Sequence, residues 1–208
     1  MTKRPYQITA VLIGIGCLSL GATVAGSQPA WGIPGMLSDE AAAWVRSNQA
    51  LNPGPGETFL INRTEPDGSR FSFQASVAPP GRITNPLDRE TIRSERMTFY
   101  APNGLTSADL EQAIQRIYGD EITADLQQSP EVLRYPSEAV LSAPPTDQNQ
   151  LQRAIQGVVR QGSQFIYWLE LTQNPDGQVQ QGQVVIFEPE WLPKIQSELA
   201  QRHNLPAQ

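Results

Sequence analysis

Residue types that commonly carry catalysis or bind metals are scarce in this chain of 208 residues, which has one histidine and one cysteine. His203 lies three residues before Pro206, near the end of a predicted helix, where the helix dipole alone favours a cation. Cys17 falls in an apolar N-terminal run. The chain beyond this run therefore lacks the components of a thiol nucleophile, a serine triad or a zinc site. We expect no catalytic residue, no metal and no cofactor.

Carboxylates are the remaining candidates for chemistry, and they form two groups. Asp120, Glu121 and Asp125 could offer oxygens to calcium, but they lack the alternating ligands, central glycine and closing glutamate of the known calcium loop. Glu188 and Glu190 flank Pro189 at the end of a predicted strand, where paired carboxylates could do acid/base work on a sugar. A solvated charge pair at a helix N-terminus is the simpler interpretation of the second group.

Arginines crowd one segment, residues 82–96, where they alternate with carboxylates. On a helix, Arg89 and Arg93 would share a face. With Arg96 they are our candidates for a patch that docks an acidic partner or anionic lipid, because the guanidinium fork can bind carboxylate or phosphate with two hydrogen bonds. The alternative is a self-neutralised charged surface whose ion pairs contribute little.

Residues 1–26 have the three parts of a secretory signal: a positive start at Lys3 and Arg4, an apolar run over 8–25, and small residues at its end. Cleavage after Ala25 or Gly26 fits this pattern. The apolar run is close to the shortest that spans a bilayer, so a retained anchor through residues 8–25 is the alternative.

Charge and cysteine content limit the function classes of the exported part. Without Lys3 and Arg4, 13 basic and 21 acidic residues remain, a net charge of −8, which argues against nucleic-acid binding. No disulfide can form within it, because Cys17 is the chain's only cysteine. About 180 residues are enough for one domain held together by packing and hydrogen bonds.

Hydrophobic periodicity predicts an α+β fold. Two hairpins, over residues 58–78 and 164–188, turn at Pro-Asp-Gly sequences, and a further strand is expected over 96–101. Trp168 and Phe187 belong to strands that are apolar on both faces, which places those strands in the middle of the sheet. Two more short strands are predicted at 132–135 and 139–142, interrupted by Pro136.

Helices are expected at four places, each with an apolar stripe at helical spacing. The first starts with Ser38 as its N-cap and has a short apolar face, which predicts loose packing on the body. The second starts near Thr106 and stops at Gly119, the third runs from Asp147 through Val159, and the last follows Pro189 or Pro193.

These patterns predict a single α+β domain, an antiparallel sheet of about five to seven strands covered by three or four helices. Its divisions are a signal peptide or anchor at 1–26, a helix and Pro/Gly linker at 27–56, and the α+β domain at 57–208. The aromatic residues Tyr167, Trp168 and Trp191 could line a ligand pocket, although such residues more often belong to a core.

The sequence therefore favours an exported, non-enzymatic accessory or binding protein of the bacterial periplasm or a comparable lumen. Its expected partner is an envelope or membrane protein, with membrane contact only through a retained leader. One alternative is a carboxylate-dependent hydrolase of glycans or cell wall, which needs two acids facing each other across a cleft. A membrane-tethered assembly factor is the other, and it requires the leader to be retained.

The leader gives the first testable prediction. Protein recovered from a native-like bacterial host should have lost about 25 residues, as the signal pattern implies, when its intact mass is measured. A full-length mass with firm membrane retention would instead establish the anchor.

Overall fold

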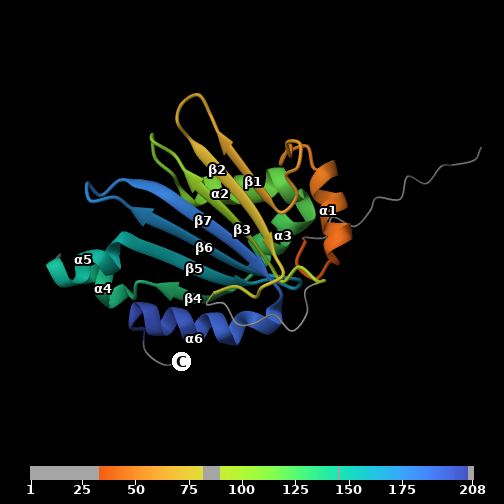
Figure 1. Cartoon of the computed structure of the whole chain (residues 1–208). Coiled ribbons are helices and arrows are strands. Elements are labelled where there is room, and N and C mark those ends of the chain that lie inside the picture. The colour runs from red at the N-terminus through yellow and green to blue at the C-terminus, as the bar shows by residue number, and fades with distance from the viewer. Residues whose placement is uncertain (1–32, 82–89, 145, 206–208) are drawn as a thin grey trace, which may run out of the picture.

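One antiparallel sheet of seven strands organises the chain (Figure 1). The computed structural model describes residues 33–81, 90–144 and 146–205. In space the strand order is β1-β2-β3-β7-β6-β5-β4. The strands are β1 (Leu60–Thr64), β2 (Arg70–Ser76), β3 (Ser94–Tyr100), β4 (Glu131–Tyr135), β5 (Ile155–Gln161), β6 (Ile166–Gln173) and β7 (Val179–Phe187).

Helices lie on both faces of this sheet, so the described part of the chain has three layers (Figure 1). On one face α1, α2 and α3 share a core with side chains of β1, β2, β3, β6 and β7. On the other face α6 packs over β4 to β7. The helices are α1 (Ser38–Ser47), α2 (Ser107–Tyr118), α3 (Asp120–Gln128), α4 (Glu138–Ser142), α5 (Asp147–Ala154) and α6 (Leu192–His203), with a 3-10 turn η1 (Pro189–Trp191) before α6. The α+β class and the antiparallel sheet are as predicted.

Both predicted hairpins are present, and local turn chemistry explains them. Strands β1 and β2 meet at the Pro66-Asp67-Gly68 turn, where Gly68 has φ +87° and donates its N–H to the Glu65 carbonyl at 3.0 Å. Strands β6 and β7 meet at the second such turn, where Gly177 has φ +79°. A residue with a Cβ rarely adopts that backbone conformation, so glycine fixes where each turn closes.

Strands β6 and β7 occupy the middle of the sheet, as their two apolar faces predict. Trp168 on β6 and Phe187 on β7 belong to the core under α6, and Trp168 is 2% exposed. The indole N–H of Trp168 donates to the Tyr135 hydroxyl at 2.6 Å, so its one polar atom is satisfied inside the core.

The predicted helix from Asp147 through Val159 is wrong in its second half. Helix α5 ends at Ala154, and residues 155–161 form strand β5 between β4 and β6. Ile155, Val158 and Val159 are β-branched and suit a strand. Gly157 leaves room for the Tyr135 ring, because a Cβ there would lie 2.2 Å from a ring atom. Tertiary pairing therefore overrides the helical spacing.

Three further local expectations need revision. The predicted strand at 132–135 is present as β4, but residues 139–142 belong to helix α4, and α3 was not predicted at all. Leu37, not Ser38, is the N-cap of α1, while the Ser38 hydroxyl donates to the Glu90 carbonyl at 2.8 Å. Helix α1 also packs tightly, since Ala41 and Val45 are fully buried in the core.

A carboxyl group is buried in the core beneath α1 and α2. Glu95 on β3 is fully buried and hydrogen-bonded to the Tyr118 hydroxyl of α2, whose ring stacks on Trp44 of α1 at 5.6 Å between centroids. Its second oxygen, Oε1, has no hydrogen-bond partner among the described residues. Burial raises the pKa of Glu95 to about 8, against the opposing effects of Tyr118 and the nearby Ile33 N–H. The carboxyl is therefore mostly protonated at neutral pH.

The central position of Trp168 predicts a large cost of truncation. Trp168→Ala should lower the free energy of unfolding by about 3–5 kcal/mol, because it leaves a cavity and removes a donor to Tyr135. Urea unfolding followed by circular dichroism measures this, with Trp168→Phe as the variant that keeps most of the volume. Wild-type stability of the alanine variant would contradict the central placement.

Glu95 predicts an unusual dependence of stability on pH. Between its ordinary pKa of 4.5 and its folded value of about 8, the folded state holds a proton that the unfolded state has lost. The contribution of Glu95 to the free energy of unfolding is therefore complete below pH 4.5. It falls by about 1.4 kcal/mol per pH unit as pH rises through this window. Glu95→Gln removes this dependence on pH. The stability of the variant relative to wild type should therefore increase as pH rises from 5 to 9.

Unfolding at pH 5, 7 and 9 measures the difference, and Glu40→Gln serves as the control. Glu40 is an exposed carboxylate on α1, so its variant should follow the wild-type curve. Parallel profiles for wild type and Glu95→Gln would show that Glu95 is ionised in the folded protein.

Candidate functional site

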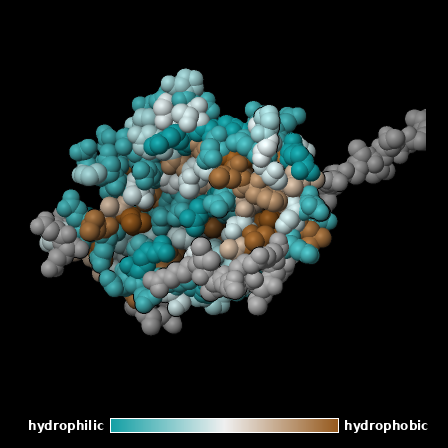
Figure 2. Space-filling view, in the orientation of Figure 1, coloured by the Kyte–Doolittle hydropathy of each residue, from teal (hydrophilic) through white to brown (hydrophobic). Residues whose placement is uncertain are grey.

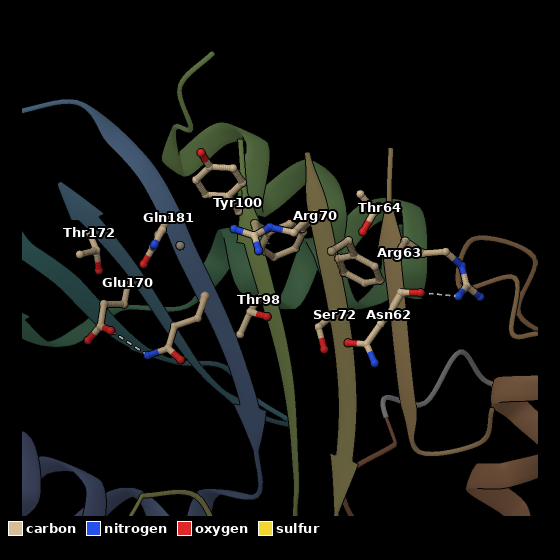
Figure 3. A pocket seen from close by; sticks show the side chains of 14 residues that line it. Asn62, Arg63, Thr64, Arg70, Ser72, Thr98, Tyr100, Glu170, Thr172 and Gln181 are labelled. Carbon is tan, nitrogen blue, oxygen red and sulfur yellow. Dashed lines mark hydrogen bonds between the residues drawn. The ribbon is translucent and has the colours of Figure 1, made fainter. Parts of the chain in front are cut away.

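Among the described residues, helix α6 covers only part of the sheet face on which it packs, and the rest of that face is polar. Two adjacent rows of side chains cross β1, β2, β3, β7 and β6 on this face. We call these ten residues the open face: Asn62, Ser72, Thr98, Gln183 and Glu170 in one row, and Thr64, Arg70, Tyr100, Gln181 and Thr172 in the next. They border a hollow of about 480 Å³ (Figure 3).

Alternation along the central strands explains where the open face begins. On β6, Trp168 lies under α6 and Glu170, two residues on, lines the hollow. On β7, Val185 and Gln183 are related in the same way. Side chains two apart in a strand share a face, so one step along the strand changes an apolar covered surface into a polar open one. Figure 2 shows this as a hydrophilic area at the centre of the face.

One end of the open face is fixed by hydrogen bonds that reach into the core. Glu170 accepts from the Tyr135 hydroxyl through Oε2 and from Gln183 Nε2 through Oε1, the latter at 2.8 Å. Burial and the neighbouring Glu170 charge raise the pKa of Tyr135 well above its ordinary value, so Tyr135 keeps its proton and stays a donor. The His203 ring stacks on Tyr135 at 3.9 Å between centroids.

The other end of the open face carries a cation. The Arg70 guanidinium lies 4.6 Å from the centroid of the Tyr100 ring, directly across the strand pair. Cation–π contact orients the guanidinium but uses none of its five N–H donors. Within residues 33–81, 90–144 and 146–205, Arg70 has no carboxylate partner.

Between these ends lie uncharged side chains with free hydrogen-bonding groups. Figure 3 shows hydroxyls and amides from five strands directed into the same hollow. Among the described residues, none of six such side chains has a hydrogen bond of its own: Asn62, Ser72, Thr98, Thr64, Gln181 and Thr172. The arrangement can therefore bind a polar ligand through many weak contacts.

The predicted docking arginines do not come together in the described part of the chain. Arg93 forms ion pairs with Glu188 at 3.0 Å and Glu190 at 3.6 Å. Arg96 lies on β3 across from Gln74, and strand alternation places it on the opposite side of the sheet from Arg93. Arg89 lies outside the described residues. Because Arg89 is one of the three, docking by the whole set is not tested and stays a prediction.

Both carboxylate groups singled out from the sequence lie away from the hollow. Asp125 holds the turn between β5 and β6, accepting from the Ser163 N–H at 2.7 Å and the Tyr167 hydroxyl at 2.8 Å. Burial alone would raise the pKa of Asp125, but these hydrogen bonds lower it. Within the described residues no group of three or more histidine, cysteine, aspartate or glutamate side chains is placed to hold a metal ion.

Three aromatic residues and the histidine lie in or beside the core. Tyr167 and Trp168 are buried in the two core clusters, and Trp191 packs on the second. Burial lowers the pKa of His203, with the Arg202 charge adding to the effect, so the ring is neutral near pH 7. The core interpretation of these aromatic residues is therefore confirmed for Tyr167 and Trp168.

A second hollow, which we call the slot, lies on the other side of β1, β2 and β3. It measures about 460 Å³ and runs between α2 and the β1–β2 hairpin. Phe71 and Phe99 form an aromatic pair beside it, with ring centroids 5.3 Å apart, and Ile117 of α2 lines it too. The slot is the more apolar of the two hollows and is a rival position for a ligand.

Sequence reasoning missed the open face, although one signal for it was present. The even-numbered residues of β2 are polar while the odd-numbered ones are apolar, which indicates one solvent-facing side. That signal cannot show that β6 and β7 contribute polar residues to the same rows, because the pairing of β7 with β3, which brings the β6–β7 hairpin beside β2, is not local in sequence.

Comparison with known proteins found no matching family model, no matching curated protein and no matching solved structure. Of the helices in the described residues, none is long and apolar enough to cross a bilayer.

Proposed function

We propose that the protein is an exported, non-enzymatic binding protein of the bacterial periplasm or a comparable lumen, and that it binds through the open face. The observation that carries this proposal is the continuity of the two polar rows over five strands, around a hollow of about 480 Å³. A hollow of this size is typical of sites that bind ligands or parts of ligands.

The fixed ends of the open face distinguish it from an ordinary solvated sheet surface. Glu170 is held at both oxygens, and Arg70 is held against Tyr100. A charged side chain that is already oriented loses less conformational entropy when a ligand binds. A sheet face that merely meets water needs no such support for its long side chains.

The number of carboxylates in the hollow favours a binding function over a hydrolytic one. Among the described residues that line it, Glu170 is the one carboxylate. A glycosidase of the two-carboxylate type needs a second acid across the bond, and Glu188 is engaged by Arg93 elsewhere. The hydrolase alternative therefore lacks the paired acids it would need in this hollow.

Export and the nature of the partner complete the proposal. The three-part pattern of residues 1–26 supports an extracytoplasmic site of action, and an envelope component is the expected partner. If the leader is retained, the same open face would serve a membrane-tethered assembly factor.

Site-specific photo-crosslinking in living bacteria tests the proposal. A benzophenone amino acid replaces Thr98, an exposed residue in the middle of the open face, and separately Gln112, an exposed residue of α2 on the opposite layer. We expect a discrete adduct from the first position and none from the second. Equal adducts at both positions, or none at either, would contradict binding through the open face.

A further inference from the structure

We propose that the open face binds an oligosaccharide that bears carboxylate groups, with Arg70 taking a carboxylate and the two polar rows taking the hydroxyls. This inference rests on the proposed function, since it assigns a ligand class to the same surface. It comes from the charge, the hydrogen-bonding inventory and the extent of the open face.

The free guanidinium of Arg70 favours an anionic ligand on the open face. Glu170 is the row's one carboxylate, and both of its oxygens already accept hydrogen bonds from Tyr135 and Gln183. Arg70 forms no hydrogen bond or ion pair among the described residues. Its planar fork can bind a carboxylate with two charge-assisted hydrogen bonds. Of the two charged side chains in the rows, Arg70 therefore has donors still free to bind an anion, in an exported part with a net charge of −8 (13 basic, 21 acidic).

A second guanidinium group, that of Arg96, also favours an anionic ligand. Arg96 lies on β3 four residues before Tyr100, on the same side of the strand, and has no hydrogen bond or ion pair in the described part of the chain. It lies next to the polar rows, about 13 Å along the strand from the level of Arg70. Two guanidinium groups on one face of the sheet favour an anionic ligand over a neutral one.

The uncharged groups favour a saccharide over a protein surface. Stable protein interfaces usually have an apolar, aromatic-rich centre. Of the large exposed hydrophobic side chains in the described residues, none belongs to the two rows; Leu60 on β1 is the nearest, one row away. Hydroxyl and amide groups can both donate and accept, which suits a ligand with a hydroxyl on nearly every carbon.

The extent of the open face fits a chain of several sugar units. The two rows cross five neighbouring strands, which at about 4.8 Å per strand gives a length of about 19 Å. At the far end, Glu170 keeps lone pairs that can accept from ligand hydroxyls, while Gln183 presents its amide oxygen. The surface therefore has an anion-binding end and a hydroxyl-binding end.

Calorimetric titration of the mature protein with trigalacturonate, a trimer of uronic acid, tests the inference. The neutral methyl ester of the same trimer is the matched ligand control, and triglutamate represents an acidic peptide. Arg70→Gln removes the carboxylate partner. Arg46→Gln, an exposed arginine in the last turn of α1 on the other layer, is the matched protein control.

We expect trigalacturonate to bind, and to bind at least about tenfold more weakly when its carboxylates are esterified or when Arg70 is replaced. Arg46→Gln should bind as wild type does, and salt should weaken the wild-type complex. A melting temperature of Arg70→Gln close to that of wild type shows that the loss is not one of folding.

Three results would overturn the inference, and each has a different consequence for the proposed function. Equal binding of acid and ester, unaffected by Arg70→Gln, would show a neutral saccharide site. Binding of triglutamate without trigalacturonate would show an acidic-peptide site. No binding of any probe would reject the ligand class, while crosslinking at Thr98 still decides whether the open face binds a partner.

Discussion

Among the described helices, α6 alone packs on one face of the seven-stranded sheet, and it is too small to cover all of that face. Helix α6 has 12 residues and is therefore about 18 Å long and about 10 Å across. Seven strands span about 29 Å at 4.8 Å between neighbours. The opposite face has three helices, α1, α2 and α3, and a larger apolar core. The face under α6 must therefore be apolar in one part and polar in the rest.

The boundary between these two parts is sharp because it depends on strand alternation. Trp168 and Val185 are at most 2% exposed beneath α6, while Glu170 and Gln183, two residues away on the same strands, line the hollow. A continuous set of hydrogen bonds crosses this boundary, from Trp168 to Tyr135 and from Tyr135 to Glu170. Such a buried polar network is favourable only when every member is satisfied. Core packing and the orientation of Glu170 are thus coupled.

The same coupling explains the position of β4 and β5. Tyr135 reaches Trp168 because its ring lies over Gly157, where any side chain would collide with it. His203, near the end of α6, stacks on the outer side of that ring. The one histidine of the chain therefore acts as an aromatic surface within the core, and its neutral state follows from burial.

Much of this fold is predictable from local sequence, and the reasons are specific. Each Pro-Asp-Gly turn places its hairpin, and Gly119 ends α2 as expected. Prediction fails where tertiary pairing outweighs local periodicity. Residues 155–161 have helical spacing but form β5, because their backbone groups pair with β4 on one side and with β6 on the other. The candidate site could not be predicted for the same reason, since its rows join strands that are up to 121 residues apart, as from Asn62 to Gln183.

Nuclear magnetic resonance of the side-chain amide groups shows most directly whether a ligand lies on the open face. The NH₂ signals of Asn62, Gln181 and Gln183 report on the open face, and those of Gln112 and Gln115 on α2 report on the opposite layer. On titration with trigalacturonate, we expect the first set to shift and saturate together while the second set stays in place. The backbone N–H signals of Phe71, Phe99 and Ile117 are followed in the same titration, and shifts confined to them would place the ligand in the slot and contradict binding at the open face.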